Sequence, residues 1–113
     1  MTDLKNNVQL IGNLGMDPET VTFENGRKLA KFSVATSQTY YDNKGEKVTD
    51  TQWHNVVAWG KLAERSENYL KKGMQVAIDG RIIYRNYEDK EGQKRYITEI
   101  VMNDVLMLSR KEN

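Results

Sequence analysis

The sequence predicts an all-β protein, a five-stranded barrel with one α-helix between its third and fourth strands. Most of the chain alternates apolar and polar residues with a period of two, which is typical of half-buried strands. One segment, residues 61–73, instead has the spacing of a helix with one apolar face. The chain has 113 residues, a length that fits one domain with a single hydrophobic core.

Three strands are expected before the helix. Residues 8–14 form the first, and Gly12 lies in its apolar row, where a missing side chain favours a bulge or sharp bend. An Asn-Gly pair then predicts a tight hairpin turn before the second strand at 29–37, in which Phe32 faces the core. A short polar loop leads to the third strand at 51–59.

The helix and two further strands complete the order. Lysines in the last helical turn, followed by Gly73, are typical of a helix end. Strand alternation resumes at 74–87, where Ile82 and Tyr84 share the parity of the core, and the last strand lies near 94–108. This is the element order of the OB-fold, which binds oligonucleotides on a sheet face and its flanking loops. Other small β-barrels share the order.

The composition argues against catalysis and against a metal or cofactor site. The chain has no cysteine and one histidine, so thiolate ligands and paired histidines are excluded. Its glycines lack the spacing of a phosphate-binding loop. The single His54 lies inside a predicted strand, where a packing or subunit-contact role is expected. We therefore expect a non-enzymatic protein without cofactor.

The N-terminal segment and the hydropathy favour a cytoplasmic protein. Residues 1–7 have neither the apolar run of a secretory signal nor the arginines of a transit peptide. No apolar stretch approaches the roughly 20 residues that a membrane span needs. No linker or repeat divides the chain, so residues 1–113 are expected to form one domain.

The net charge is only +1, but the charges are unevenly distributed. Residues 27–87 hold eleven lysines and arginines against six acids, whereas residues 1–26 hold one lysine against four acids. A basic middle in a nearly neutral chain suits a localised anionic partner better than a uniformly basic surface.

Aromatic and basic side chains share one face of the predicted strands. Trp53 and Trp59 are six residues apart and have the same parity, either as core residues or as a stacking platform. Arg81, Arg85 and Tyr87 share the parity opposite to the core in the fourth strand. Stability does not require such a row. It predicts a surface where rings stack on bases and guanidinium groups hold phosphates.

Several segments of the chain resemble bacterial single-stranded DNA-binding proteins. The segments that carry the likeness are residues 7–19, 32–37, 53–64, 69–76 and 95–100. They cover nearly the whole chain in order and without large gaps. The resemblance implies a homotetramer of OB-folds, around which single-stranded DNA wraps in replication, recombination and repair, in the cytoplasm at the nucleoid.

The resemblance also implies roles for individual residues. Base-stacking positions correspond to Tyr40, Trp53, Trp59 and Tyr87. Together with the row described above, it gives the expected phosphate-binding residues as Lys61, Lys72, Arg81, Arg85 and Arg95. The family histidine that matches His54 lies at a subunit interface. Family members usually continue into a flexible linker and an acidic tip, whereas this chain ends in residues 109–113, which are mildly basic. The sequence alone leaves two alternatives open, a shortened chain or a family member without the tip, and in both cases no recruitment of repair proteins through an acidic tip is expected.

Alternative functions remain open on the sequence alone. A dimeric primosomal replication protein has the same fold, and a mature mitochondrial-type single-strand binder also lacks the acidic tip. From a different class, the chain could be a protein-interaction OB module or an RNA-binding domain. Subunit number and quenching of tryptophan emission by oligo(dT) distinguish these alternatives.

Overall fold

The computed structural model describes residues 4–109, which form six strands and one helix. The strands are β1 (Val8–Leu14), β2 (Glu19–Thr22), β3 (Lys28–Tyr41), β4 (Lys47–Trp59), β5 (Gln75–Glu88) and β6 (Lys94–Met107), and the helix is α1 (Lys61–Tyr69). Two expectations from the sequence, that residues 1–7 form no targeting signal and that the C-terminal residues recruit no repair proteins, fall partly on residues 1–3 and 110–113, which lie outside the described residues.

Five of these strands close into the predicted barrel. The sheet order is β1-β5-β6-β4-β3-β2, and β1 pairs additionally with β3, so that β1, β5, β6, β4 and β3 form a closed ring. In chain order, helix α1 follows β4 and precedes β5, which are the third and fourth strands of the barrel, as predicted. It ends at Tyr69 rather than at residue 73, because Leu70 already has an extended backbone. Strand β2 was not predicted. It pairs with β3 through a tight hairpin that contains the Asn-Gly turn.

Gly12 allows β1 to reach β3 at the point where the barrel closes. A Cβ atom on residue 12 would lie 2.1 Å from the carbonyl oxygen of Ala35 in β3. Backbone atoms at that distance cannot yield as a flexible side chain would. The missing side chain therefore serves a close approach between strands, which is one of the reasons a strand tolerates glycine.

The core lies inside the barrel, under α1. Its buried members come from every barrel strand, from the helix and from the residue that follows the helix: Leu14, Ala30, Phe32, Val34, Val56, Ala58, Ala63, Leu70, Val76, Ile78, Ile100, Met102 and Val105. The core position of Phe32 is confirmed. The core position of Tyr84 is wrong, since 77% of Tyr84 is exposed. It has the parity of the core, but β5 has already left the barrel at that point.

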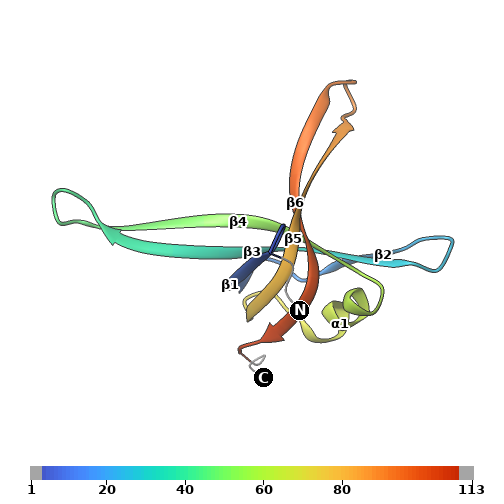
Figure 1. Ribbon diagram of the computed structural model, residues 1–113, viewed down its shortest axis with the longest axis horizontal. Coiled ribbons are helices and arrows are strands. Elements are labelled where there is room, and N and C mark those ends of the chain that lie inside the picture. The colour runs from blue at the N-terminus through green and yellow to red at the C-terminus, as the bar shows by residue number, and fades with distance from the viewer. Residues whose placement is uncertain (1–3, 110–113) are drawn as a thin grey trace.

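Two long ribbons project from the barrel at a wide angle (Figure 1). One is the outer part of β3–β4 and the other is the outer part of β5–β6, with the short β2–β3 hairpin opposite the first. The radius of gyration is 16.2 Å, compared with about 13 Å for a compact domain of this length. The ribbons account for this difference, and they leave both of their faces accessible.

Candidate nucleic-acid interface

A continuous outward face runs across the strands on the side opposite to the core. Cross-strand pairing aligns Arg81 of β5 with Val101 of β6, Val101 with Val57 of β4, and Val57 with Lys31 of β3. The next residue row inward, Ile82–Ile100–Val56–Phe32, points into the barrel. Residues in register point to the same side of a sheet, so one face is core and the other is available to a ligand.

A groove crosses this outward face where the barrel parts of β3 and β4 lie beside β5 and β6. We call it the sheet groove and define it by two adjoining hollows that share Lys31, Val57, Arg85 and Glu99. One hollow adds Trp59 and Ile83, and the other adds Asn55 and Ile97, among other residues. The floor is thus partly apolar, with charged side chains along it. This is the composition expected where flat bases and phosphates of one strand are to be bound together.

Trp53 presents a ring on the outward face of β4. It is 63% exposed, and it pairs across the ladder with Ala35, a small residue. Its ring lies over the backbone of Gly15, where an added Cβ would approach Cζ3 of the ring to 2.3 Å. The exposure rules out the core interpretation of Trp53. Gly15 supports one part of the ring while much of the residue faces solvent.

Trp59 has the same parity as Trp53 but is half-buried. Its ring stacks with Phe23, with ring centroids 5.9 Å apart and planes inclined by 24°. The guanidinium carbon of Arg27 lies 4.3 Å from the centroid of the Trp59 ring. Both partners come from the β2–β3 hairpin, so Trp59 is neither a core residue nor a bare platform.

Arg85 and Glu99 form a bidentate ion pair in the sheet groove. Nε of Arg85 donates to Oε1 of Glu99 at 2.7 Å, and Nη2 donates to Oε2 at 3.1 Å. Glu99 is only 5% exposed, and its hydrogen bonds raise the pKa of Arg85 above the ordinary arginine value. The buried carboxylate is therefore neutralised by its neighbour, and much of the hydrogen-bonding capacity of Arg85 is directed to Glu99 rather than outward.

Tyr87 and Arg95 face each other across the outer part of the β5–β6 ribbon. Both are exposed, and Nε of Arg95 donates to Oδ2 of Asp89 at 2.9 Å. That hydrogen bond holds the pKa of the Asp89 carboxyl below its usual value. Arg81 lies on the same outward face, closer to the barrel, and is exposed. The ribbon thus brings together three of the predicted phosphate-binding residues and one predicted stacking residue.

The other predicted residues lie away from this row. Tyr40 is exposed near the tip of the β3–β4 ribbon, but its parity is that of the core, opposite to Trp53. Lys61 is the first residue of α1, and Lys72 follows the helix, where its backbone N–H donates to Asp17. Both lysines are exposed, at the two ends of the helical segment rather than in the sheet.

Several residues on the outward face were not selected from the sequence. They are Phe23, Arg27, Lys31 and Tyr41. Tyr41, rather than Tyr40, shares the parity of Trp53. Lys31 lies in the sheet groove. The Asn-Gly turn offered a signal for Phe23 and Arg27, because a tight hairpin places the residues that flank it side by side.

His54 points to the core side of β4, where the β3–β4 ribbon leaves the barrel. It is half-buried, and its Nε2 lies 2.9 Å from Oγ1 of Thr36. Within residues 4–109, no group of three or more metal-ligating side chains could hold a metal ion. The helix in that part of the chain is too short and too polar to span a membrane.

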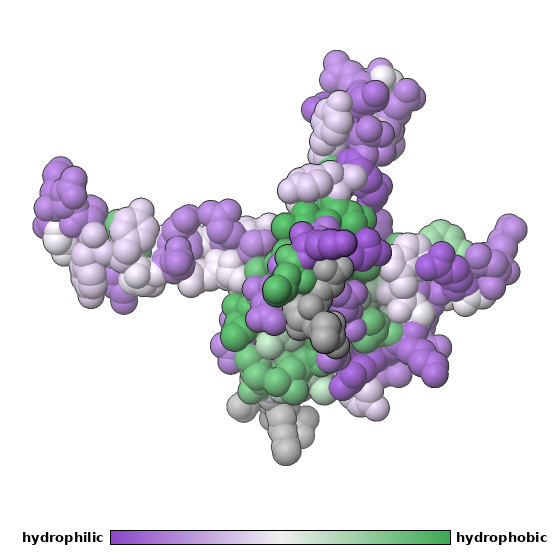
Figure 2. Space-filling view, in the orientation of Figure 1, coloured by the Kyte–Doolittle hydropathy of each residue, from purple (hydrophilic) through white to green (hydrophobic). Residues whose placement is uncertain are grey.

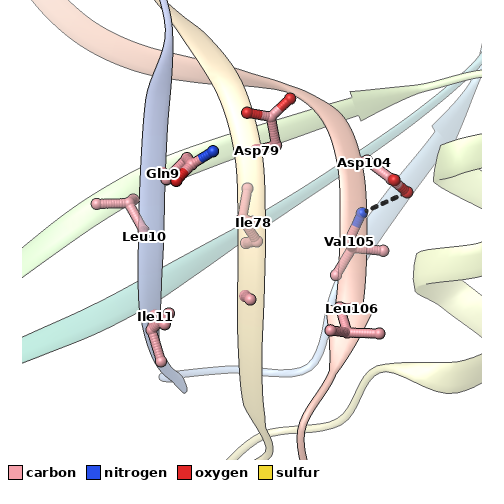
Figure 3. A pocket seen from close by; sticks show the side chains of 9 residues that line it. Gln9, Leu10, Ile11, Ile78, Asp79, Asp104, Val105 and Leu106 are labelled. Atoms are coloured by element: carbon pink, nitrogen blue, oxygen red, sulfur yellow. Dashed lines mark hydrogen bonds between the residues drawn. The ribbon is translucent and has the colours of Figure 1, made fainter. Parts of the chain in front are cut away.

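A second outward surface, on β1, β5 and β6, is apolar. Ile11 and Leu106 are each more than 60% exposed there, and they line a hollow bordered by Asp79 and Asp104 (Figure 3). Figure 2 shows hydrophobic residues gathered over the barrel, whereas the ribbons are mainly hydrophilic. The side of β1 opposite to β5 has no strand partner at Val8–Ile11 within the described chain.

Comparison with known proteins identifies the family. A sequence model described as the Single-strand binding protein family matches residues 5–108. The chain is 47% identical over 109 residues to Single-stranded DNA-binding protein 1 of Chlorobaculum tepidum, covering 96% of this chain and 67% of the relative. It is 48% identical over 109 residues to the Single-stranded DNA-binding protein of Neisseria meningitidis, covering 96% of this chain and 63% of the relative. The chain thus spans about two-thirds of the length of these relatives.

Two solved structures have the same fold. The chain of the Plasmodium falciparum SSB complex with ssDNA superposes with a TM-score of 0.86 at 30% identity, covering 96% of this chain and 98% of the other. A deletion mutant of the single-stranded DNA binding protein from Thermus aquaticus gives 0.79 at 26% identity, covering 92% and 50%. The predicted OB-fold and the resemblance noted from the sequence are confirmed, and the chain belongs to the single-strand binding protein family.

Proposed function

We propose that this protein binds single-stranded DNA without sequence preference and without catalysis, as one OB-fold domain. Unpaired DNA lies along the outward face, with bases on the rings of Trp53, Trp59 and Tyr87 and phosphates near basic side chains. Lys31, Arg81 and Arg95 supply charge on this face. Four further residues add contacts where the DNA strand passes them. A base stacks on the ring of Tyr40, and phosphates are bound by Lys61, Lys72 and Arg85.

The single observation that carries this proposal is the exposed ring of Trp53 on the outward face, beside the sheet groove. A tryptophan exposed to 63% adds little to the stability of a monomer but offers a broad stacking surface. The π-face of every base can use that surface, so the contact tolerates any sequence. The family membership and the likeness to a chain solved in a complex with ssDNA support the same function.

Titration with oligo(dT) tests the proposal. The intrinsic emission of Trp53 and Trp59 is expected to fall as bases stack on the rings, and an end-labelled oligonucleotide is expected to gain anisotropy at the same concentrations. A duplex of the same length serves as the control and is expected to bind much more weakly. Equal affinity for the duplex would exclude the proposed mode, and oligo(rU) titrated in parallel tests the RNA-binding alternative.

We further propose that four copies assemble, and that they work at the nucleoid in replication, recombination and repair. The exposed apolar surface with Ile11 and Leu106 and the unpaired edge of β1 support self-association, because such edges tend to pair with another chain. His54 is assigned to a contact between subunits. Light scattering is expected to give the mass of four chains. A mass of two chains would favour the dimeric primosomal alternative instead.

A further inference from the structure

Trp59 is partly covered in the unbound protein by side chains of the β2–β3 hairpin. The guanidinium of Arg27 lies over the Trp59 ring at 4.3 Å from its centroid, and Phe23 stacks beside it. A base that is to stack on Trp59 at the position of Arg27 has to compete with the protein's own cation.

The guanidinium of Arg27 has no other partner in the part of the chain that the structure describes. No carboxylate of residues 4–109 lies within ion-pair distance of it, and none of its side-chain N–H groups donates a hydrogen bond there. Arg85 and Arg95, by contrast, each donate to an acid. The edge of the Arg27 guanidinium is therefore free to take up an anion.

We propose that Arg27 is a displaceable cover of Trp59: a base takes its place on the ring, and the released guanidinium binds a phosphate of the same strand. This inference rests on the proposed function, because it assigns a regulatory role to a residue of the same site. It makes Arg27 a specificity device, since only a ligand that offers both a flat ring and an anion compensates for its displacement.

The local structure allows the side chain to move while the backbone stays in place. The backbone N–H of Arg27 donates to Oδ1 of Asn25, and the carbonyl of Arg27 accepts from the N–H of Phe23. Both bonds hold the turn without using the guanidinium. Among the described residues, the guanidinium of Arg27 is held on the half-buried Trp59 ring by a cation–π contact alone. A base replaces that contact by stacking on the ring, and a phosphate offers the released guanidinium a bidentate charge-assisted contact. Exchange is therefore favourable once the strand arrives.

The test compares Arg27 and Arg27→Ala in a Trp53→Phe background, where Trp59 is the only tryptophan of the chain. Affinity for labelled oligo(dT) is measured over a range of salt concentrations. The loss of one phosphate contact is expected to lower the log–log salt slope by about 0.7. At high salt, where phosphate contacts contribute least, the variant is expected to bind roughly two- to fivefold more tightly because the competing cation is gone. The plots of log affinity against log salt concentration for the two proteins are therefore expected to cross.

Other outcomes overturn the proposal. A lower slope without tighter binding at any salt would mean that Arg27 stays on Trp59 and contacts phosphate from there. An unchanged slope would mean that Arg27 only packs against the ring. Arg27→Lys keeps the charge and is expected to retain the wild-type slope, and Arg65→Ala on α1 is the matched control. Failure of the proposed function itself is distinguishable, since the wild-type protein would then not bind oligo(dT).

Discussion

Trp53 is held in place by the residue beneath it, and this makes its contribution to binding separable from stability. The ring is exposed and rests over Gly15. Trp53→Ala is expected to weaken oligo(dT) binding by about 1–3 kcal/mol while thermal unfolding changes little. Trp53→Phe keeps a ring and is expected to lose less affinity. Anisotropy and circular dichroism check the two quantities, and unfolding of the alanine variant would show that the ring belongs to the core after all.

The support that Gly15 gives to the Trp53 ring can be tested by substituting Gly15 itself. A methyl group on residue 15 would approach Cζ3 of Trp53 to 2.3 Å and Oγ of Ser33 to 2.8 Å. Since both are side-chain atoms, Gly15→Ala is expected to displace the ring and lower DNA affinity while the barrel persists. Gly12→Ala is the comparison, because its Cβ would meet backbone in β3 and is expected to lower the melting temperature. Equal loss of stability in both variants would contradict this difference.

Arg85 has two roles, an ion pair with Glu99 in the folded protein and the proposed contact with a DNA phosphate. Stability measurements separate them. Arg85→Met leaves a carboxylate that is 5% exposed without its ion-pair partner, which is expected to cost about 1–3 kcal/mol of folding free energy. Arg95→Met, whose acid lies on an exposed ribbon, is the matched control and is expected to change stability little. Urea unfolding measures both. A stable Arg85→Met variant with weakened DNA binding would show that phosphate is the main partner of Arg85.

Helix α1 is tied to the β2–β3 hairpin through the acid Glu67. Glu67 of α1 accepts a hydrogen bond from Thr20 of β2 and forms an ion pair with Lys28 of β3. The bond with Lys28, followed by the bond with Thr20, lowers the pKa of Glu67 below its ordinary value. The hairpin that carries Phe23 and Arg27 is thereby braced against the helix, so the helix contributes to the position of the cover on Trp59.

This brace is expected to depend on pH in a defined direction. Because the pKa of Glu67 is lower in the folded protein, its stabilising contribution is complete above the unfolded value near 4.5 and is lost as the pH falls through the folded value. Glu67→Gln is therefore expected to be less stable than the wild type at pH 7 and equal to it at strongly acidic pH. Glu64→Gln on the same helix is the control. If Glu67→Gln were still less stable than the wild type at strongly acidic pH, the loss of stability would come from packing and not from the charge of Glu67.

The five barrel strands and the helix could be predicted from the sequence, whereas strand β2 and the contacts between the elements could not. Alternation marks strands and places Phe32 inward, because burial of one face imposes a period of two. The same period continues through Tyr84, although the barrel has ended there, since parity says which side a residue takes but not what lies behind that side. The contact of Arg85 with Glu99 depends on the β5–β6 register, in which Arg85 pairs with Ile97. Residue spacing alone does not fix that register.

A net charge of +1 is compatible with DNA binding because basic and acidic side chains lie mainly on different surfaces of the protein. The outward face carries basic residues of β3, β5 and β6. It also carries two acids that line the sheet groove: Glu99, which is neutralised by an ion pair with Arg85, and Glu19, which pairs with Lys31 in the β2–β3 ladder. Many other acids lie elsewhere, on α1, in the hairpin loops and beside the apolar surface of β1, β5 and β6. The electrostatic field that a DNA strand meets depends on where these charges lie and only weakly on the net charge.

The salt dependence of DNA binding is expected to depend on the basic residues of the outward face and not on the net charge of the protein. Each phosphate that the protein neutralises on a single strand contributes about −0.7 to the slope of log affinity against log salt concentration. Arg81→Gln removes a cation from the outward face and is expected to make the slope shallower by about 0.7. Arg65→Gln makes the same change in net charge on α1 and is expected to leave the slope unchanged. Both variants are compared with the wild type by anisotropy on one oligo(dT) length. If the two substitutions shift the slope equally, the DNA responds to overall charge, and the outward face does not define its path.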